Sequence, residues 1–407
     1  MKYDADILIV GGGLNGPALA LALAGTGQSV VVVDALPKDT RAEAGFDGRS
    51  YALALASIRV LDGIGLWPRV AEHAQPMLKI VASDGRAGEG AAPFFLQFDH
   101  AEIEEGPMGH MLEDRHLRPA LIDAMDAAGI TQLSGETVVA QSADAHGATV
   151  QLASGRRLRA RLVVGCDGRD SGTATRAGIR RTGWDYGQTG LVCAVEHALP
   201  HEGVAHQFFM PPGPLAILPL PGNRSSIVWS ETTARAAEIH AMDDAAYLDV
   251  LRPRFGSFLG EIALAGKRYA YPLRLSVANR FIGPRLALVG DAAHGLHPIA
   301  GQGFNLGLRD IAALAEVVTE AARRGEDIAS PLVLERYQQW RRFDTMLMAV
   351  GTDGVNRLFS NDNPVLRGIR DLGLGVVGAL PGLRRACIRE AAGLTGDMPR
   401  LMRGLPI

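Results

Sequence analysis

Glycines and carboxylates with a defined spacing carry the clearest chemistry near the start of the chain. Gly11, Gly13 and Gly16 stand in a G-x-G-x-x-G pattern directly after the apolar run DILIV. In this pattern the first glycine permits a tight turn, the second lets a pyrophosphate approach the backbone, and the third lets helix and strand pack closely. Asp34 ends the next apolar run, where it either accepts hydrogen bonds from ribose hydroxyls or simply caps a strand. Because the glycine pattern alone is common, the carboxylate strengthens the prediction of a dinucleotide-type cofactor.

A second glycine-rich segment, LALVGDAAHGLHPIAGQGFNLGLRD, begins at Leu286 and ends at Asp310. Its apolar start predicts a buried strand, Gly290 and Asp291 break that strand, and a later amphipathic pattern predicts a helix. The unpaired N–H groups at a helix start favour an anion or a polar ring. We therefore expect this segment and the N-terminal glycines to be two half-sites for one large cofactor.

Two histidines, His294 and His297, lie within this second segment. They could be metal ligands, proton carriers or partners in structural hydrogen bonds. Spacing of i, i+3 on a loop, without cysteine or carboxylate partners, is poor evidence for a metal ion. We predict no metal site, and the other two interpretations remain open.

Further polar residues follow or precede other predicted elements. Asp167 and Gly168 come directly after the apolar run RLVVG, and ligands gather at the carboxyl ends of strands in open α/β sheets. Arg49 precedes a predicted helix at Tyr51–Ile64, where it is either a solvated loop charge or a planar donor to phosphates.

The middle of the chain, residues 180–280, has alternating runs and many prolines, which predict an antiparallel sheet rather than a phosphate-binding unit. Its aromatic residues include Phe208, Trp229 and Tyr271. These residues either line a flat apolar pocket for a substrate or belong to the ordinary core of the sheet.

Composition excludes several classes of protein. The 407 residues carry a formal charge of −3, whereas proteins that bind nucleic acids usually have a basic excess. The three cysteines are widely spaced and form no CxxC, which fits a reducing compartment. No signal peptide and no apolar stretch long enough to span a membrane is visible. We expect a cytoplasmic protein.

The C-terminal residues differ in charge from the rest. Residues 363–407 hold seven arginines against three acidic residues, Asp371, Glu390 and Asp397. Such a basic, leucine-rich arm suits an anionic membrane surface, and it equally suits packing against the main body or a second subunit. All three interpretations remain open.

Together these motifs resemble the class A flavoprotein aromatic hydroxylases, and within them the ubiquinone-biosynthesis hydroxylases. The resemblance rests on GGGLNG with Asp34, on the Asp167–Gly168 pair, on the segment from Gly290 to Asp310, and on DGRSYALALAS and TDGVNRLFSNDNP. It covers nearly the whole chain.

The resemblance implies an α/β fold: a doubly wound, Rossmann-type FAD domain, an antiparallel-sheet substrate domain and a helical C-terminal arm. We expect the FAD domain to be discontinuous. The expected ranges are 1–76, 106–180 and 281–350 for the FAD domain, 77–105 and 181–280 for the substrate domain, and 351–407 for the arm.

The resemblance also assigns cofactor roles. The N-terminal glycines would hold the FAD pyrophosphate, Asp34 the adenosine ribose, and Asp291 the ribityl or pyrophosphate region. Gly301, Gln302, Gly303 and Asn305 would present backbone to the flavin ring. The full expected set is Gly11, Gly13, Leu14, Gly16, Asp34, Arg49, Arg115, Val139, Asp167, Gly168, Gly290, Asp291, Pro298, Gly301, Gln302, Gly303 and Asn305, with Pro298 beside the reactive face.

Two positions depart from the family pattern. Asp34 stands where many relatives have glutamate, but its shorter carboxylate can still reach a ribose. Ala174 stands where relatives usually have an arginine linked to FAD and to the reduced nicotinamide, and Arg176 lies two residues further. The second departure leaves the site of the electron donor open.

The implied activity is hydroxylation of the aromatic ring of a polyprenyl-phenol by O2 and NAD(P)H through a flavin hydroperoxide. Alternatives are hydroxylation of another small phenol, a prenyl reductase, a halogenase, a noncatalytic flavin- or prenyl-binding subunit, and a nicotinamide dehydrogenase. The isolated tryptophans lack the halogenase tryptophan-x-tryptophan motif. The family also suggests peripheral contact with the inner face of the cytoplasmic membrane, other ubiquinone-biosynthesis proteins, or a homodimer.

Overall fold

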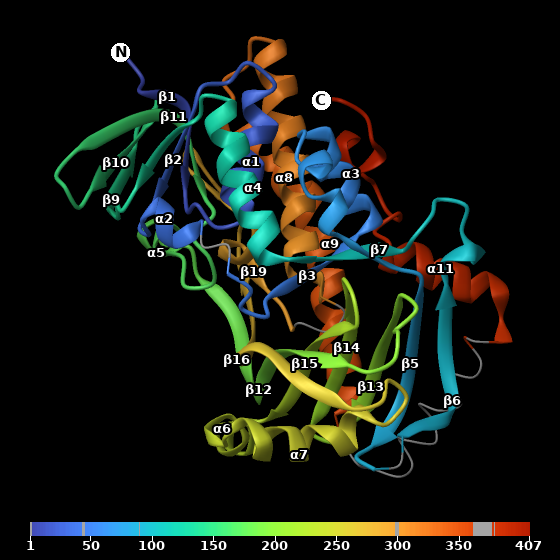
Figure 1. Cartoon of the computed structure of the whole chain (residues 1–407). Helices are drawn as coiled ribbons and strands as arrows, with labels where there is room; N and C mark the ends of the chain where they lie inside the picture. The colour runs from blue at the N-terminus through green and yellow to red at the C-terminus, as the bar shows by residue number, and fades with distance from the viewer. Residues whose placement is uncertain (1, 43–44, 89, 298–300, 361–376, 378) are drawn as a thin grey trace.

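Two large sheets with a small sheet between them organise the chain in the computed structural model (Figure 1). The structure describes residues 2–42, 45–88, 90–297, 301–360, 377 and 379–407. Helices cover the first sheet and a helical pair covers the second. The predicted α/β class, with an added antiparallel sheet, is confirmed.

The first sheet has a parallel core in the order β18-β11-β1-β2-β8. The strands of β1 and β2 are runs of valine, isoleucine and leucine that are buried along almost their whole length, as expected for a parallel sheet covered on both faces. The bounds are β1 (Ala5–Val10), β2 (Val30–Asp34), β8 (Thr131–Ser134), β9 (Val138–Ala143), β10 (Ala148–Leu152), β11 (Arg157–Gly165), β17 (Ile282–Gly283) and β18 (Leu286–Leu288).

Small side chains let helices approach this sheet and each other closely. The sequence of α1 is NGPALALALA, and α1 packs against both α4 and α8, as the three neighbouring helices in Figure 1 show. The bounds are α1 (Asn15–Ala24), α2 (Lys38–Arg41), α3 (Leu55–Gly63), α4 (Asp114–Ala127), α5 (Gly172–Arg176), α8 (Gln302–Arg323) and α9 (Pro331–Phe359).

The second sheet is antiparallel except where β13 pairs with β5, and its order is β19-β16-β12-β15-β14-β13-β5-β6. Its edge strand β19 comes from the second glycine-rich segment, which also supplies β18 of the first sheet. This segment therefore contributes a strand to each large sheet. The bounds are β5 (Lys79–Arg86), β6 (Gly90–Asp99), β12 (Arg181–His197), β13 (Val204–Met210), β14 (Gly213–Leu220), β15 (Arg224–Thr232), β16 (Ile262–Ala278), β19 (His294–Gly295), α6 (Thr233–Ala241) and α7 (Asp244–Phe255).

The small sheet has the order β3-β7-β4 and lies between the two large sheets in Figure 1. Its strands are β3 (Ser50–Ala54), β4 (Gln75–Met77) and β7 (Gly109–Glu113). Residues of β3, β4 and β7 share a core with residues of the second sheet, so this small sheet joins the two halves of the molecule.

The C-terminal part begins differently from the expected arm. Helix α9 runs without a break across positions 350 and 351, where the arm was expected to start, because its hydrogen-bonded turns continue to Phe359. After residues 361–376 and 378, which lie outside the described chain, α11 (Pro381–Ala391) contacts the main body through Arg384–Glu102 at 2.8 Å and Arg389–Glu105 at 2.5 Å. No helix of the described residues is long and apolar enough to cross a membrane.

Candidate functional site

The predicted motifs meet at one edge of the first sheet. Gly11, Asp34, Asp167 and Gly290 each stand at or just after the carboxyl end of β1, β2, β11 or β18, and these four strands are neighbours in the parallel core. Parallel strands place all their carboxyl ends on the same edge, which is where ligands bind in open α/β sheets. Sheet topology therefore converts four distant motifs into one site.

The first glycine loop is tight at two positions and open at a third. A Cβ on Gly11 would lie 2.4 Å from the carbonyl oxygen of Cys166, and a Cβ on Gly16 would lie 1.9 Å from the carbonyl oxygen of Gly11. In the part of the chain that the structure describes, no atom lies within 4 Å of the corresponding position on Gly13. Leu14 caps the start of α1 just beyond this opening. The open space beside a helix N-terminus fits a pyrophosphate.

A buried arginine organises this loop around Asp34. The Gly12 N–H donates to Asp34 Oδ2 at 2.5 Å, and Arg41 donates to the Gly12 carbonyl at 2.9 Å and to Ser134 Oγ at 2.7 Å. Arg41 is only 3% exposed, and the sequence offered no signal beyond a basic residue after a strand. Each carboxylate oxygen can accept more than one hydrogen bond, so Asp34 retains capacity for a ribose hydroxyl.

The side chain of Asn15 joins the two half-sites. A Cβ on Gly290 would lie 2.1 Å from Asn15 Nδ2, and a Cβ on Gly307 would lie 2.3 Å from Asn15 Oδ1. Only glycines leave room for this side chain, so α1 and α8 approach each other closely. Sequence reasoning missed Asn15, which stands between the second and third glycines of the first motif.

The start of α8 forms the other end of the site. Gly301 adopts the left-handed conformation with φ +64° and caps α8, which begins at Gln302. No atom of the described residues lies within 4 Å of a Cβ placed on Gly303. The positive end of a long helix therefore borders open space, as a polar ring with developing negative charge requires. Pro298 lies outside the described residues.

Asn305 acts through its side chain rather than only its backbone. Its Oδ1 accepts a hydrogen bond from the Ala54 N–H at 2.9 Å, and its Nδ2 donates to the Ala52 carbonyl at 2.8 Å. These bonds fix α8 to β3. The expectation that Asn305 only presents backbone to a ring missed this role, because the partner strand is distant in sequence.

The two predicted arginines are both ion-paired. Arg49, 41% exposed at its side chain, lies 2.7 Å from Asp47 and 3.2 Å from Asp114. It stands directly before β3, next to the strand that Asn305 holds. Arg115 pairs with Glu113 at 2.6 Å, and its guanidinium lies 5.0 Å from the centre of the Phe46 ring.

Of the remaining predicted positions, one is hydrogen-bonded within its own turn and two have side chains exposed to solvent. Asp167 accepts hydrogen bonds from Ser171 Oγ at 2.5 Å and from the Thr173 N–H at 2.8 Å, which orders the turn at Gly168. In contrast, the side chain of Asp291 is 37% exposed, with Arg169 3.8 Å away. Val139 on β9 is 52% exposed. The last two groups are free to contact a ligand.

Comparisons with known proteins agree with this geometry. A family model described as an FAD binding domain matches residues 4–347. Ubiquinone hydroxylase UbiL of Rhodospirillum rubrum is 46% identical, over 99% of this chain and 94% of that protein. The 3-demethoxyubiquinol 3-hydroxylase of Escherichia coli is 36% identical, over 97% and 100%. The chain belongs to the FAD-dependent ubiquinone hydroxylase family.

Membership confirms the predicted FAD cofactor and the predicted class, an aromatic monooxygenase that uses O2 and NAD(P)H. The open cradle at Gly13 and the free helix start at Gly303 fit the two ends of FAD. The solved structure of p-nitrophenol 4-monooxygenase PnpA from Pseudomonas putida aligns with a TM-score of 0.80 over 98% of this chain and 100% of that chain. At 20% identity this likeness supports the fold alone.

Behind the flavin half-site, the hydroxylase has a buried charge network. Asp310, fully buried, accepts hydrogen bonds from the Gly290 N–H at 2.9 Å, from His294 Nε2 at 2.6 Å and from Arg341 Nε at 2.7 Å. Burial works to raise the pKa of Asp310, but His294 and Arg341 outweigh it and hold that pKa below its usual value. Of the interpretations given for the two histidines, a structural hydrogen bond is therefore observed for His294.

The three aromatic residues expected at the substrate are not on one face of the second sheet. On β12, Leu191 lies opposite Trp229. The residue before it, Gly190, lies opposite Tyr271. Because successive side chains of a strand point to opposite faces, Trp229 and Tyr271 lie on different sides. Phe208 shares the Trp229 face through Leu215.

The helix-covered face is core. Phe208 and Trp229 pack with α6 and α7, and Trp229 is 1% exposed beneath the Arg254 guanidinium at 4.8 Å. Tyr271, 43% exposed, stacks with Tyr269 on the other face. The core interpretation thus holds for two of the three residues, and only Tyr271 remains a pocket candidate.

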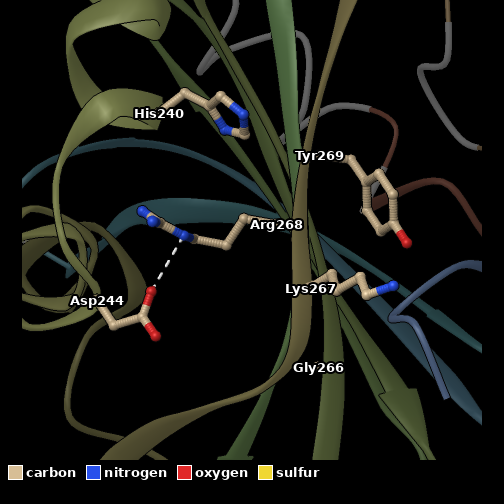
Figure 2. Close-up of a pocket in the computed structure, with 6 residues that line it drawn as sticks. All are labelled: His240, Asp244, Gly266, Lys267, Arg268 and Tyr269. Carbon is tan, nitrogen blue, oxygen red and sulfur yellow. Dashed lines mark ion pairs between the residues drawn. The ribbon is translucent and has the colours of Figure 1, made fainter.

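Figure 2 shows the same alternation on β16 around a surface hollow of about 400 Å³. Arg268 points toward Asp244 at the start of α7, 3.2 Å away, whereas Lys267 and Tyr269 lie on the opposite side of the strand. Burial raises the pKa of Tyr269, and the charge of the nearby Asp47 raises it further. The Tyr269 face therefore looks toward the loop that carries Arg49.

Proposed function

We propose that this chain hydroxylates the aromatic ring of a polyprenyl-phenol intermediate of ubiquinone biosynthesis, with FAD, O2 and NAD(P)H. The observation that carries the proposal is full-length identity of 46% to a ubiquinone hydroxylase in a chain whose half-sites meet around Asn15. No other part of the described chain offers a comparable arrangement of glycine loops and helix starts.

FAD bound at these loops would supply the activation of dioxygen, and the chain's own residues would position the ring and exclude water. The glycine loop at Gly13 and the start of α8 would hold the cofactor. The face of the second sheet that carries Tyr269 and Tyr271 would cover the substrate. Water exclusion matters because transfer of an oxygen atom to the ring competes with release of hydrogen peroxide into the solvent.

The test uses the purified holoenzyme with 2-prenylphenol as a short-tail probe. We expect NAD(P)H-dependent O2 uptake that yields a product with one additional oxygen atom, identified by mass spectrometry. A product that gains hydrogen instead would indicate a prenyl reductase, and flavin binding without turnover would indicate a noncatalytic subunit. Deletion of the gene should cause a prenylphenol to accumulate, and unchanged ubiquinone without such an intermediate would contradict the pathway.

We also propose that the chain contacts an anionic membrane surface peripherally. Phe343, Leu347 and Val350 are 76%, 61% and 66% exposed, and their spacing places them on one face of α9. An exposed apolar stripe of this kind marks an interaction site. The neighbouring Arg342 is exposed, and a prenyl tail is itself a membrane solute.

Vesicle flotation tests this contact. We expect the chain to float with vesicles containing phosphatidylglycerol and not with pure phosphatidylcholine, and we expect Leu347→Ser to weaken flotation. A stripe buried in a homodimer or against another protein of the pathway would instead appear as a larger mass in solution, which Leu347→Ser would reduce without any lipid.

A further inference from the structure

The imidazole of His297 is buried without a hydrogen-bond partner among the described residues. The residue is 1% exposed, and neither Nδ1 nor Nε2 has a partner. Burial lowers the pKa of His297 to about 4, although the nearby Asp353 opposes this effect. The ring is therefore neutral near pH 7, with one nitrogen that can donate and one that can accept.

Two further polar groups beside His297 are also incompletely paired. The Tyr186 ring meets the His297 ring edge to face, with centroids 5.1 Å apart, and the Tyr186 hydroxyl has no partner of hydrogen-bond geometry in the described chain. Asp353 binds Arg357 through Oδ2 at 2.9 Å, but its buried Oδ1 has no such partner there. Burial and Asp353 raise the pKa of Tyr186. We call these three residues the His297 cluster.

Folding alone does not account for this cluster. Buried polar groups in native proteins are nearly always hydrogen-bonded, because an unmet group destabilises the folded state. His294, three residues earlier, follows that rule through its bond to Asp310. Tyr186 and Asp353 act on each other, whereas both nitrogens of His297 remain unmet among the described residues, which indicates a ligand or ordered water that pairs with the imidazole.

The position of the cluster identifies which ligand it serves. His297 lies between β19 and the start of α8, within the segment whose two ends belong to the flavin half-site. Tyr186 lies in β12 where the register with β16 shifts, between Asp185 and Gln188, and such bulges redirect side chains near active sites. Asp353 comes from α9, which Asn356 ties to Gln188 at 3.1 Å. The cluster thus stands at the junction of the cofactor domain and the substrate sheet, where ligand sites concentrate.

We propose that the His297 cluster binds the phenolic hydroxyl of the substrate, with His297 as the acceptor of its hydrogen bond and Tyr186 as a second polar contact. Tyr186 is partly exposed, and its ring lies directly against the imidazole. Asp353 is a positioning residue whose carboxylate acts on both His297 and Tyr186 through its charge. A hydrogen bond accepted from the phenol enriches its ring in electrons, which favours attack on an electrophilic oxygen. The inference rests on the proposed function and assigns the polar end of its substrate.

Binding of two matched probes tests the proposal, namely 2-prenylphenol and its methyl ether, which lacks the hydroxyl proton. Their affinities for the FAD-loaded protein are measured by quenching of tryptophan fluorescence. We expect the wild type to prefer the phenol by about tenfold, the range of one buried hydrogen bond. His297→Phe should abolish the preference, Tyr186→Phe should reduce it, and His297→Gln, which retains a polar group, should restore part of it.

His110→Phe is the matched control. His110 is half-buried and also meets an aromatic ring edge to face, Trp67 at 5.3 Å, and burial lowers its pKa as well, but it lies on β7. It should keep the preference and the FAD content of the wild type. If His297→Phe folds, binds FAD and still prefers the phenol, the inference is wrong. If His297→Phe does not fold, an unchanged preference in Tyr186→Phe equally contradicts the inference.

Turnover separates this inference from the proposed function. A wild type that prefers the phenol through His297 but forms no hydroxylated product would contradict the function and leave the binding role standing. Hydroxylation in which His297→Phe changes neither the KM ratio of phenol to ether nor the product per NAD(P)H consumed would contradict the inference and leave the function standing.

Discussion

Substitution of Gly13 by alanine should separate cofactor binding from folding. Among the residues that the structure describes, no atom lies within 4 Å of the added Cβ, and the backbone of Gly13 is not in the left-handed region. The apoprotein should therefore fold normally. The same Cβ would occupy the open space of the glycine loop, where the pyrophosphate of FAD must approach the backbone N–H groups.

The substitution should make the fold slightly more stable and the binding of FAD weaker. An alanine in place of a compatible glycine stabilises the fold by about 0.4–1 kcal/mol, because the unfolded chain loses conformational freedom. Loss of one hydrogen bond to a charged phosphate weakens binding by about 1.5–3 kcal/mol. Every 1.4 kcal/mol is tenfold, so FAD should bind roughly 10- to 150-fold more weakly.

Two variants bracket this result. In Gly16→Ala the Cβ would lie 1.9 Å from the Gly11 carbonyl oxygen, so that protein should lose stability as well as FAD. In Gly25→Ala, at the end of α1, the nearest atom is 3.8 Å away, and both properties should be retained. Urea unfolding of the apoproteins and titration with FAD measure the two quantities. Wild-type FAD affinity in Gly13→Ala would refute the placement of the pyrophosphate.

Four other substitutions probe the rest of the site. Asp310→Asn removes a buried carboxylate from His294 and Arg341 and should lower the free energy of unfolding by about 3–5 kcal/mol in urea titrations. Because the folded-state pKa of Asp310 is lowered, its contribution in the wild type should be complete above the unfolded pKa and should be lost as pH falls through the folded one. Asp291→Ala should purify as stable apoprotein, and a normal flavin absorbance would contradict its role. Trp229→Ala should cost about 3–5 kcal/mol of stability, whereas Tyr271→Ala should instead raise KM, and the reverse pattern would place the substrate on the helix-covered face.

The sequence was sufficient for the class of fold and for a dinucleotide-type cofactor, which the family resemblance specified as FAD. Glycine spacing at Gly11–Gly16, apolar runs that end in Asp34 or Gly290, and a helix beginning near Gly301 are local features, and backbone geometry imposes the same residues wherever such a turn must hold a phosphate. Alternating runs and prolines likewise indicated the antiparallel sheet. These patterns depend on neighbours in the chain, so one sequence reveals them.

Tertiary structure alone decided which side chains act together. Asn15 fits between Gly290 and Gly307, and Asn305 holds β3, through contacts between residues distant in sequence. Strand register, which sequence patterns leave undefined within the middle domain, placed Trp229 in the core and Tyr271 on the opposite face.

The two histidines show the same division. Both stand in one short loop, and the sequence could not distinguish them. Packing gave His294 the buried carboxylate of Asp310 and placed His297 beside Tyr186 and Asp353, with no hydrogen bond to any residue that the structure describes. Local pattern and the family resemblance therefore predicted the cofactor, while the long-range arrangement of strands and helices decided which polar groups lie together.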